Sequence, residues 1–179
     1  MNLGLTSEPR AYYNGHILSQ REVADGRIVG CILYSRSRVE SVDTVTFGPL
    51  CMEPEWQGRG VGKALLDATL PLAREAGYPG VVIFGEPDYY PLHGFKTCDK
   101  FGITTPDGRN FPAFMAYELR EGALADVHGR FFEAELFEHF GEIAAAELAA
   151  FDADFEPLEK QRFPGQWDGW AVIGLDKAC

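Results

Sequence analysis

The feature that most constrains the fold is a glycine-rich stretch lying between an apolar segment and a helical pattern. Residues 49–64 read PLCMEPEWQGRGVGKA, with glycine at the alternate positions 58, 60 and 62. Glycine permits backbone conformations that other residues avoid and lets a ligand approach the chain closely. The first N–H groups of a helix have no intrahelical partner, and the helix dipole adds partial positive charge there. The stretch therefore predicts a strand, a loop and a helix start suited to a pyrophosphate.

Two better-known phosphate loops do not fit this stretch. The pattern G-x-x-x-x-G-K-[ST] needs glycine at position 57 and a hydroxyl at position 64, where the chain has Gln57 and Ala64. The dinucleotide pattern G-x-G-x-x-G needs glycine at position 63, which is Lys63. A glycine-rich turn that only begins a helix is the alternative interpretation. Three glycines together with Arg59 and Lys63 favour anion binding over that alternative.

Strands and one long helix surround the loop. Apolar β-branched runs predict strands at 27–34 and 43–51, and Gly48-Pro49 predicts a bulge or break in the second because proline cannot donate to a ladder. A helix is expected from about 60 to 76, kinked at Pro71 and stopped by Gly77. Its apolar face is predicted to hold Val61, Leu65, Ala68, Leu72 and Ala76.

The rest of the pattern predicts a mixed α/β sheet. A buried parallel strand is expected at 81–84 and a last core strand at 113–119. Shorter segments complete this expectation: a turn or helical piece at 88–93, strands at 95–98 and 127–132, an alanine-rich helix at 142–151, and a tail in which Trp167 and Trp170 suggest docking.

The charge of the chain is large and uneven. The formal net charge of its 179 residues is −11, which argues against nucleic-acid and anionic-membrane partners. Residues 121–179 hold 13 of the 27 acidic residues but only 4 of the 16 basic ones. This acidic tail either steers a cationic substrate or, the interpretation we favour, is a solvated helix face.

The spacing of the cysteines argues against a zinc site, and the apolar runs argue against a membrane helix. The four cysteines form no C-x-x-C pair and no zinc-ligand spacing with the four histidines. No apolar run approaches the ~18 residues of a membrane helix, and no signal segment begins the chain. A reduced, soluble, cytoplasmic protein without a metal is expected.

The loop sequence resembles a known family. Residues 57–62, QGRGVG, match the Q/R-x-x-G-x-G/A signature of the GCN5-related N-acetyltransferases, the GNAT family. The likeness continues through 81–95 (VVIFGEPDYYPLHGF) and covers about 26–132 in all. The run 101–119 and the Gly122-Ala123-Leu124 that follows it resemble a bacterial subgroup of predicted GNAT enzymes. The family resemblance implies a mixed, mostly antiparallel central sheet with a splayed pair of parallel strands. It also implies three parts: a shortened N-terminal segment (1–25), an acetyl-CoA-binding core (26–132) and an acidic helical extension (133–179).

The resemblance also implies a site for acetyl-CoA as co-substrate. The loop amides are expected to hold the pyrophosphate, and the bulged strand end to pair with the pantetheine arm. The residues carried over for cofactor binding are Leu50, Cys51, Met52, Gln57, Gly58, Arg59, Gly60, Val61, Gly62 and Lys63. Tyr90 lies four residues before Gly94-Phe95, where many members keep a tyrosine beside the coenzyme A sulfur.

Direct acetyl transfer requires a neutral amine and a proton for the leaving thiolate. Tyr90 is the expected catalytic donor, with a packed aromatic as the alternative interpretation and adjacent Tyr89 as an alternative donor. No base is assigned, because the strand position that is glutamate in some members is Thr46. Nearby carboxylates are more often solvated, and a water is an equal candidate; these carboxylates are Asp43, Glu86 and Asp88.

The expected function is therefore transfer of an acetyl group from acetyl-CoA to a primary amine of an unidentified small-molecule or peptide acceptor. The alternative is a coenzyme A-binding module without catalysis, which acts as a sensor or as a partner in an assembly. Exposed edge strands would also be compatible with a homodimer.

Overall fold

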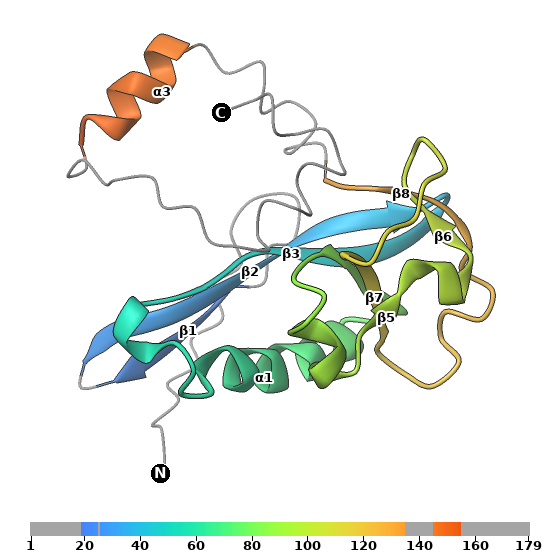
Figure 1. The fold of residues 1–179 in the computed structure, drawn as a ribbon, viewed down its shortest axis with the longest axis horizontal. Helices are drawn as coiled ribbons and strands as arrows, with labels where there is room; N and C mark the ends of the chain where they lie inside the picture. Colours follow the sequence, from blue (N-terminus) through green and yellow to red (C-terminus); the bar gives the residue numbers. More distant parts are fainter. Residues whose placement is uncertain (1–18, 25, 135–144, 155–179) are drawn as a thin grey trace. The chain divides into compact units, whose positions relative to one another are not determined.

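The computed structural model describes residues 19–24, 26–134 and 145–154, and Figure 1 shows their arrangement. The chain divides into two compact units, 1–132 and 133–179, and each is described by itself. The second unit contains helix α3 (Ala145–Asp152) in its described part. The predicted helix at 142–151 thus agrees with α3 over the described residues, while 142–144, Trp167 and Trp170 lie outside them.

The first unit is built on a mixed, mostly antiparallel sheet, as the resemblance implied. The strands lie in the order β5-β7-β4-β3-β2-β8-β6, with β1 also paired to β2. Parallel pairs are β3 with β4 and β6 with β8, and the remaining pairs are antiparallel. The strands are β1 (Ser19–Ala24), β2 (Arg27–Val39), β3 (Val42–Met52), β4 (Gly80–Phe84), β5 (Lys96–Thr97), β6 (Ile103–Thr104), β7 (Phe114–Glu118) and β8 (Gly129–Phe132).

Strands β2 and β3 form a long antiparallel hairpin that extends beyond the predicted ranges. Their register shifts between the pairs Tyr34↔Phe47 and Ile32↔Leu50, so β3 has one more residue than β2 in this interval. The extra length contains Gly48-Pro49, whose peptide bond is cis. The predicted bulge is therefore confirmed.

The helix that follows the loop is α1 (Val61–Glu75), and it continues through Pro71. Gly77, at φ +93°, ends it as expected. The predicted apolar face was partly wrong, because Ala68 and Leu72 are only half-buried and Ala76 is exposed. The face that is buried contains Val61, Gly62, Leu65, Leu66, Thr69 and Ala73. The predicted face omitted the apolar Leu66 and Ala73 as well as Gly62 and the polar Thr69, so it was rotated from the face that is buried.

Thr69 is buried because it has a partner on the sheet. Its Oγ1 donates to Leu65 O at 2.7 Å and lies 2.9 Å from Tyr34 Oη, so it accepts the tyrosine proton. Tyr34 belongs to the core cluster between α1 and the sheet. Along β4, Val81 and Ile83 join this cluster, whereas Val82 joins a second one on the opposite side with Phe114 and Phe131.

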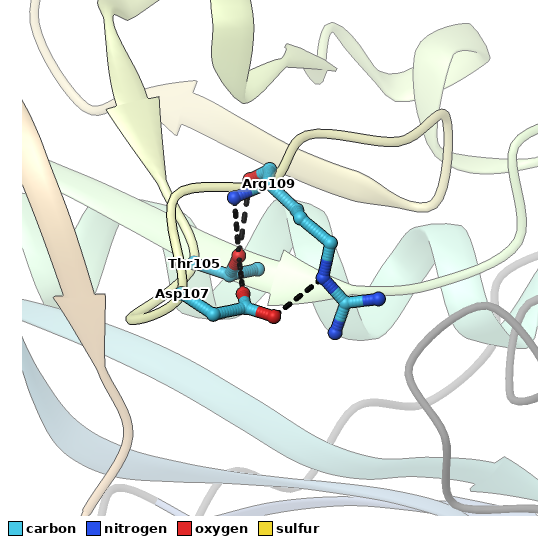
Figure 2. Close-up of polar contacts among 3 residues, drawn as sticks. All are labelled: Thr105, Asp107 and Arg109. Carbon is cyan, nitrogen blue, oxygen red and sulfur yellow. Dashed lines mark hydrogen bonds and ion pairs between the residues drawn. The ribbon is translucent and has the colours of Figure 1, made fainter.

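Short elements complete the first unit. The predicted strand at 95–98 is reduced to β5, and three short 3-10 helices are present in the described residues: η1 (Pro54–Trp56), η2 (Tyr90–His93) and η3 (Cys98–Phe101). The turn after β6 is held by Thr105, whose Oγ1 donates to Asp107 Oδ1 at 2.5 Å and accepts the Arg109 N–H at 2.9 Å (Figure 2). No helix in the described part of the chain is long and apolar enough to cross a membrane.

The Tyr34–Thr69 hydrogen bond gives an asymmetric prediction. Thr69→Val leaves the buried Tyr34 hydroxyl without its acceptor and should lower the free energy of unfolding by about 1–3 kcal/mol. Tyr34→Phe leaves Thr69 bonded to Leu65 O and should cost only about 1 kcal/mol. Urea unfolding of both variants measures the difference, and a larger loss for Tyr34→Phe would contradict it.

Candidate functional site

The two central parallel strands separate after a short contact. Strand β3 pairs with β4 at Val45↔Val81, whereas the end of β3 at 50–52 pairs only with β2 among the described residues. Past its end, β4 stays with the neighbouring antiparallel strand, because Gly85 N–H donates to Ala113 O at 2.9 Å. Within the described part of the chain, the last residues of β3 therefore have a free backbone edge on the side of β4. Such an edge can pair with the amides of an extended ligand.

The glycine-rich loop places a helix start beside this edge. Gly58 and Gly60 have φ values of +68° and +88°, and a Cβ at either would meet nothing within 4 Å. Gly60 caps α1 without a side-chain hydrogen bond, and its carbonyl accepts the Ala64 N–H at 2.9 Å. The amides of Val61, Gly62 and Lys63 precede that bond, so they are the donors that a helix start leaves for an anion. The open glycine surface fits a pyrophosphate.

Both predicted basic residues lie at this loop, each with a local contact. The Arg59 guanidinium carbon is 5.5 Å from the centre of the Trp56 ring. Lys63 forms an ion pair with Asp67, one turn further along α1. Gln57 is exposed and ends η1, with its N–H donating to Pro54 O at 3.3 Å. Asp67 thus offsets part of the positive charge that the sequence assigned to the loop.

Three elements converge at Gly62. A Cβ built there would lie 2.7 Å from Tyr89 Oη and 3.3 Å from Met52 Cε. The end of β3, the first turn of α1 and the segment entering η2 therefore meet at one point, and only glycine permits the approach. The structure brings together Met52 and Gly62, which the sequence assigned to one site. Sequence reasoning did not foresee that Tyr89, rather than Tyr90, contacts the helix start.

Tyr90 lies where β3 and β4 separate. Its ring is 5.8 Å from Phe47 on β3 and 5.4 Å from Phe95, and it covers Gly85 at the end of β4. A Cβ at Gly85 would be 2.3 Å from Tyr90 Cε2, so this glycine makes room for the ring. Gly85 was also missed, although a glycine directly after a buried strand was its visible signal.

Both tyrosines hold their protons firmly. Burial raises the pKa of Tyr90, and the neighbouring Tyr89 raises it further. The pKa of Tyr89 is raised by its burial and then by the charge of Asp67. Each phenol is thus protonated through neutral pH and can donate a proton. The same contacts that pack the Tyr90 ring keep its hydroxyl protonated, and they also make it a weaker acid than a free phenol.

Candidates for a general base are less well placed. Thr46 is buried on β3, and Asp43, Glu86 and Asp88 are exposed. The His93 ring is 4.5 Å from that of Tyr89. Within the described residues, no group of three or more His, Cys, Asp or Glu side chains is placed to hold a metal ion.

The contact at Gly62 predicts a coupling between Gly62 and Tyr89. An alanine in a helix is normally about 1 kcal/mol more favourable than glycine. Gly62→Ala should not give this gain, because its methyl group must displace the Tyr89 hydroxyl. In a Tyr89→Phe background the same substitution should be more favourable than in the parent protein, by up to about 1 kcal/mol, because only the Met52 methyl group at 3.3 Å then has to shift. Urea unfolding of the four proteins tests this, and equal effects in both backgrounds would refute the contact.

Comparison with known proteins places this geometry in a family. A family model described as "Acetyltransferase (GNAT) family" matches residues 6–95, half of the chain, and so begins before the predicted core boundary at 26. The "Uncharacterized N-acetyltransferase YhbS" of Escherichia coli K12 is 28% identical over 118 residues, which are 65% of this chain and 69% of that protein. The "Uncharacterized N-acetyltransferase YjhQ" of the same strain is 36% identical over 78 residues, 41% and 43% of the two chains.

Solved structures agree with this assignment. The crystal structure of Escherichia coli YhbS in complex with CoA has a TM-score of 0.64 at 28% identity and covers 69% of this chain and 71% of its own. A GNAT acetyltransferase from Brucella melitensis in complex with acetyl-CoA has a TM-score of 0.50 at 24% identity, covers 67% and 68% of the two chains, and shows the fold alone. The chain belongs to the GNAT family of acetyltransferases.

Proposed function

We propose that this chain transfers the acetyl group of acetyl-CoA to a primary amine by direct attack on the thioester. The observation that carries the proposal is the free edge at the end of β3 beside the glycine-lined start of α1. Family membership and the likeness to YhbS, whose structure was determined in complex with CoA, support it. The acceptor is an amine of a small molecule or peptide.

In this proposal, backbone groups do most of the cofactor binding. The amides of Val61, Gly62 and Lys63 donate to the pyrophosphate, and the open glycines 58 and 60 let it approach. The edge of Leu50, Cys51 and Met52 pairs with the amides of the pantetheine arm, as an added strand would. Arg59 and Lys63 supply positive charge, and Gln57 lies at the loop entrance.

The chemistry requires two proton movements. An amine of the lysine type has a pKa near ~10.4 and must lose a proton before it attacks the thioester carbonyl. As the carbon–sulfur bond breaks, Tyr90 gives its proton to the leaving thiolate and recovers one from water. The attacking nitrogen loses one proton before attack and a second as the amide forms, and in this proposal solvent water takes both. The core of the proposed enzyme is 26–132, a cytoplasmic unit, and 133–179 is an acidic extension.

The second candidate function is a coenzyme A-binding module without catalysis. Thr46 favours it, because a buried hydroxyl occupies the strand position where some family members have a glutamate. Both candidates predict binding of acetyl-CoA, whereas only the first predicts release of the thiol when an amine is present.

Binding is expected to raise thermal stability. Acetyl-CoA at 100 times its Kd should add about 2.7 kcal/mol, a rise in Tm of roughly 5–10 °C for a chain of this size. Arg59→Ala and Lys63→Met should each weaken binding by up to about fivefold, as expected for exposed charge pairs. Asp67→Asn is the matched control, since it frees Lys63 and should strengthen binding. No Tm shift with acetyl-CoA would overturn both candidate functions.

Turnover separates the two tyrosines. Thiol release from acetyl-CoA with a panel of primary amines should fall by roughly 10²–10⁴-fold in kcat for Tyr90→Phe, with little change in the KM of acetyl-CoA. Tyr89→Phe is the control and should largely keep its kcat. Because burial raises the pKa of Tyr90, kcat should not decline as pH rises to ~10, the ordinary tyrosine value.

Unchanged turnover in Tyr90→Phe would remove Tyr90 from the mechanism. The reverse pattern, a loss only in Tyr89→Phe, would assign the donor role to Tyr89. Tight binding without thiol release for any amine in the panel would support the non-catalytic module.

A further inference from the structure

Two cysteines face each other across the hairpin, and one of them, Cys51, lies on the strand end that is proposed to bind the pantetheine arm. Cys31 on β2 and Cys51 on β3 are direct register partners, and their Sγ atoms are 3.3 Å apart. Both are free thiols. Facing residues on adjacent antiparallel strands have Cα atoms about 4.5–5.5 Å apart, within the range that a disulfide spans. A bridge between them therefore needs no rearrangement of the two strands.

The pair lies on the sheet face opposite α1. The residues that alternate with it, Ile32 on β2 and Leu50 and Met52 on β3, pack against the core cluster under the helix. Side chains alternate between the faces of a strand, so the two thiols point to the other side. Cys51 is exposed and Cys31 is half-buried. A small oxidant thus reaches Cys51 from solvent, while Cys31 is held against it.

We propose that Cys31 and Cys51 are a dithiol oxidation site, which a hydroperoxide converts into an intramolecular disulfide between β2 and β3. The Cys51 sulfur attacks the O–O bond and takes one oxygen, which yields a sulfenic acid and releases an alcohol, or water from hydrogen peroxide. The Cys31 sulfur then attacks the Cys51 sulfur. The S–O bond breaks, the S–S bond forms, and the Cys31 proton leaves with the hydroxyl group as water. Two thiols are oxidised and one peroxide is reduced.

The surroundings of Cys31 suit the residue that reacts second, by attacking the sulfenic acid of Cys51. Its burial, together with the hydrogen bond and charge of Cys51, raises the pKa of Cys31 to about 11, so it is a thiol at neutral pH. The thiolate is the form that attacks peroxide, which leaves Cys31 protected from direct oxidation. Cys31 reacts only after Cys51 has become a sulfenic acid, because the departing hydroxyl group then accepts the Cys31 proton.

The third described cysteine provides an internal control. Cys98 is fully buried, and its burial raises its pKa. It should stay reduced under conditions that oxidise the facing pair. Cys179 lies outside the described residues, so a Cys179→Ser variant keeps it from exchanging with the pair.

The test is peptide mapping after mild hydrogen peroxide treatment of the full chain carrying Cys179→Ser. The protein is alkylated in denaturant and digested with trypsin without reduction. Cleavage after Lys and Arg places Cys31 in residues 28–36, Cys51 in 39–59 and Cys98 in 97–100. We expect a linked 28–36/39–59 pair that dithiothreitol abolishes, with 97–100 alkylated. In the Cys31→Ser variant the link should be lost and Cys51 should be trapped as sulfenic acid by dimedone.

Several results would overturn the proposal. They are a sulfinic or sulfonic Cys51 without a link in the parent protein, a link that includes Cys98, or disulfides only between two chains. The parent protein alone decides among these outcomes, so the proposal remains testable even if Cys31→Ser does not fold. The mapping uses no acetyl-CoA, and its result is therefore independent of the proposed enzymatic function.

Discussion

The separation of β3 from β4 is the constraint on which the rest of the site depends. The parallel contact is made at Val45↔Val81, and Gly48-Pro49 then adds length to β3 while β4 follows its antiparallel neighbour. A free backbone edge results, and the gap at its base is occupied by the Tyr90 ring over Gly85. Had the strands stayed paired, their ladder would have used the same backbone groups that are proposed to bind pantetheine. The backbone groups at the end of β3 are therefore left for a ligand to pair with instead of β4.

The anion site proposed for this chain, whose net charge is −11, depends on local rather than total charge. Backbone amides at the start of α1 provide partial positive charge that no side-chain count includes. Arg59 and Lys63 add to it, while Asp67 pairs with Lys63. This arrangement would repel polyanions at long range and leave the proposed site favourable for a pyrophosphate. Cys51 belongs both to the end of β3 and to the dithiol on the sheet face opposite α1. Residues 50–52 therefore take part in both the proposed coenzyme A site and the proposed oxidation site.

The sequence predicted the fold class and the position of the loop well, because glycine and proline report on backbone geometry directly. Gly58 and Gly60 have the positive φ values that were the reason for expecting an anion loop, and Gly48-Pro49 lies at the bulge. The predicted buried face of α1 was partly wrong, because it omitted Leu66 and Ala73 and because the burial of Thr69 depends on a partner, Tyr34, that is 35 residues away in sequence. The contact of Tyr89 with Gly62 was also missed, because the sequence does not show which of two adjacent tyrosines the η2 segment directs toward the helix start. Residues 1–18 lie outside the described part, so the predicted N-terminal segment stays a prediction there.

We propose that the end of β3 and the start of α1 together form one binding site for coenzyme A. An ¹⁵N chemical-shift titration of the full chain with acetyl-CoA tests it residue by residue. We predict that the largest amide shifts fall within 50–52 and 58–63, with a second group around Tyr89 and Tyr90. Saturable binding whose largest shifts lie elsewhere, with the amides of Val61, Gly62 and Lys63 unmoved, would contradict it.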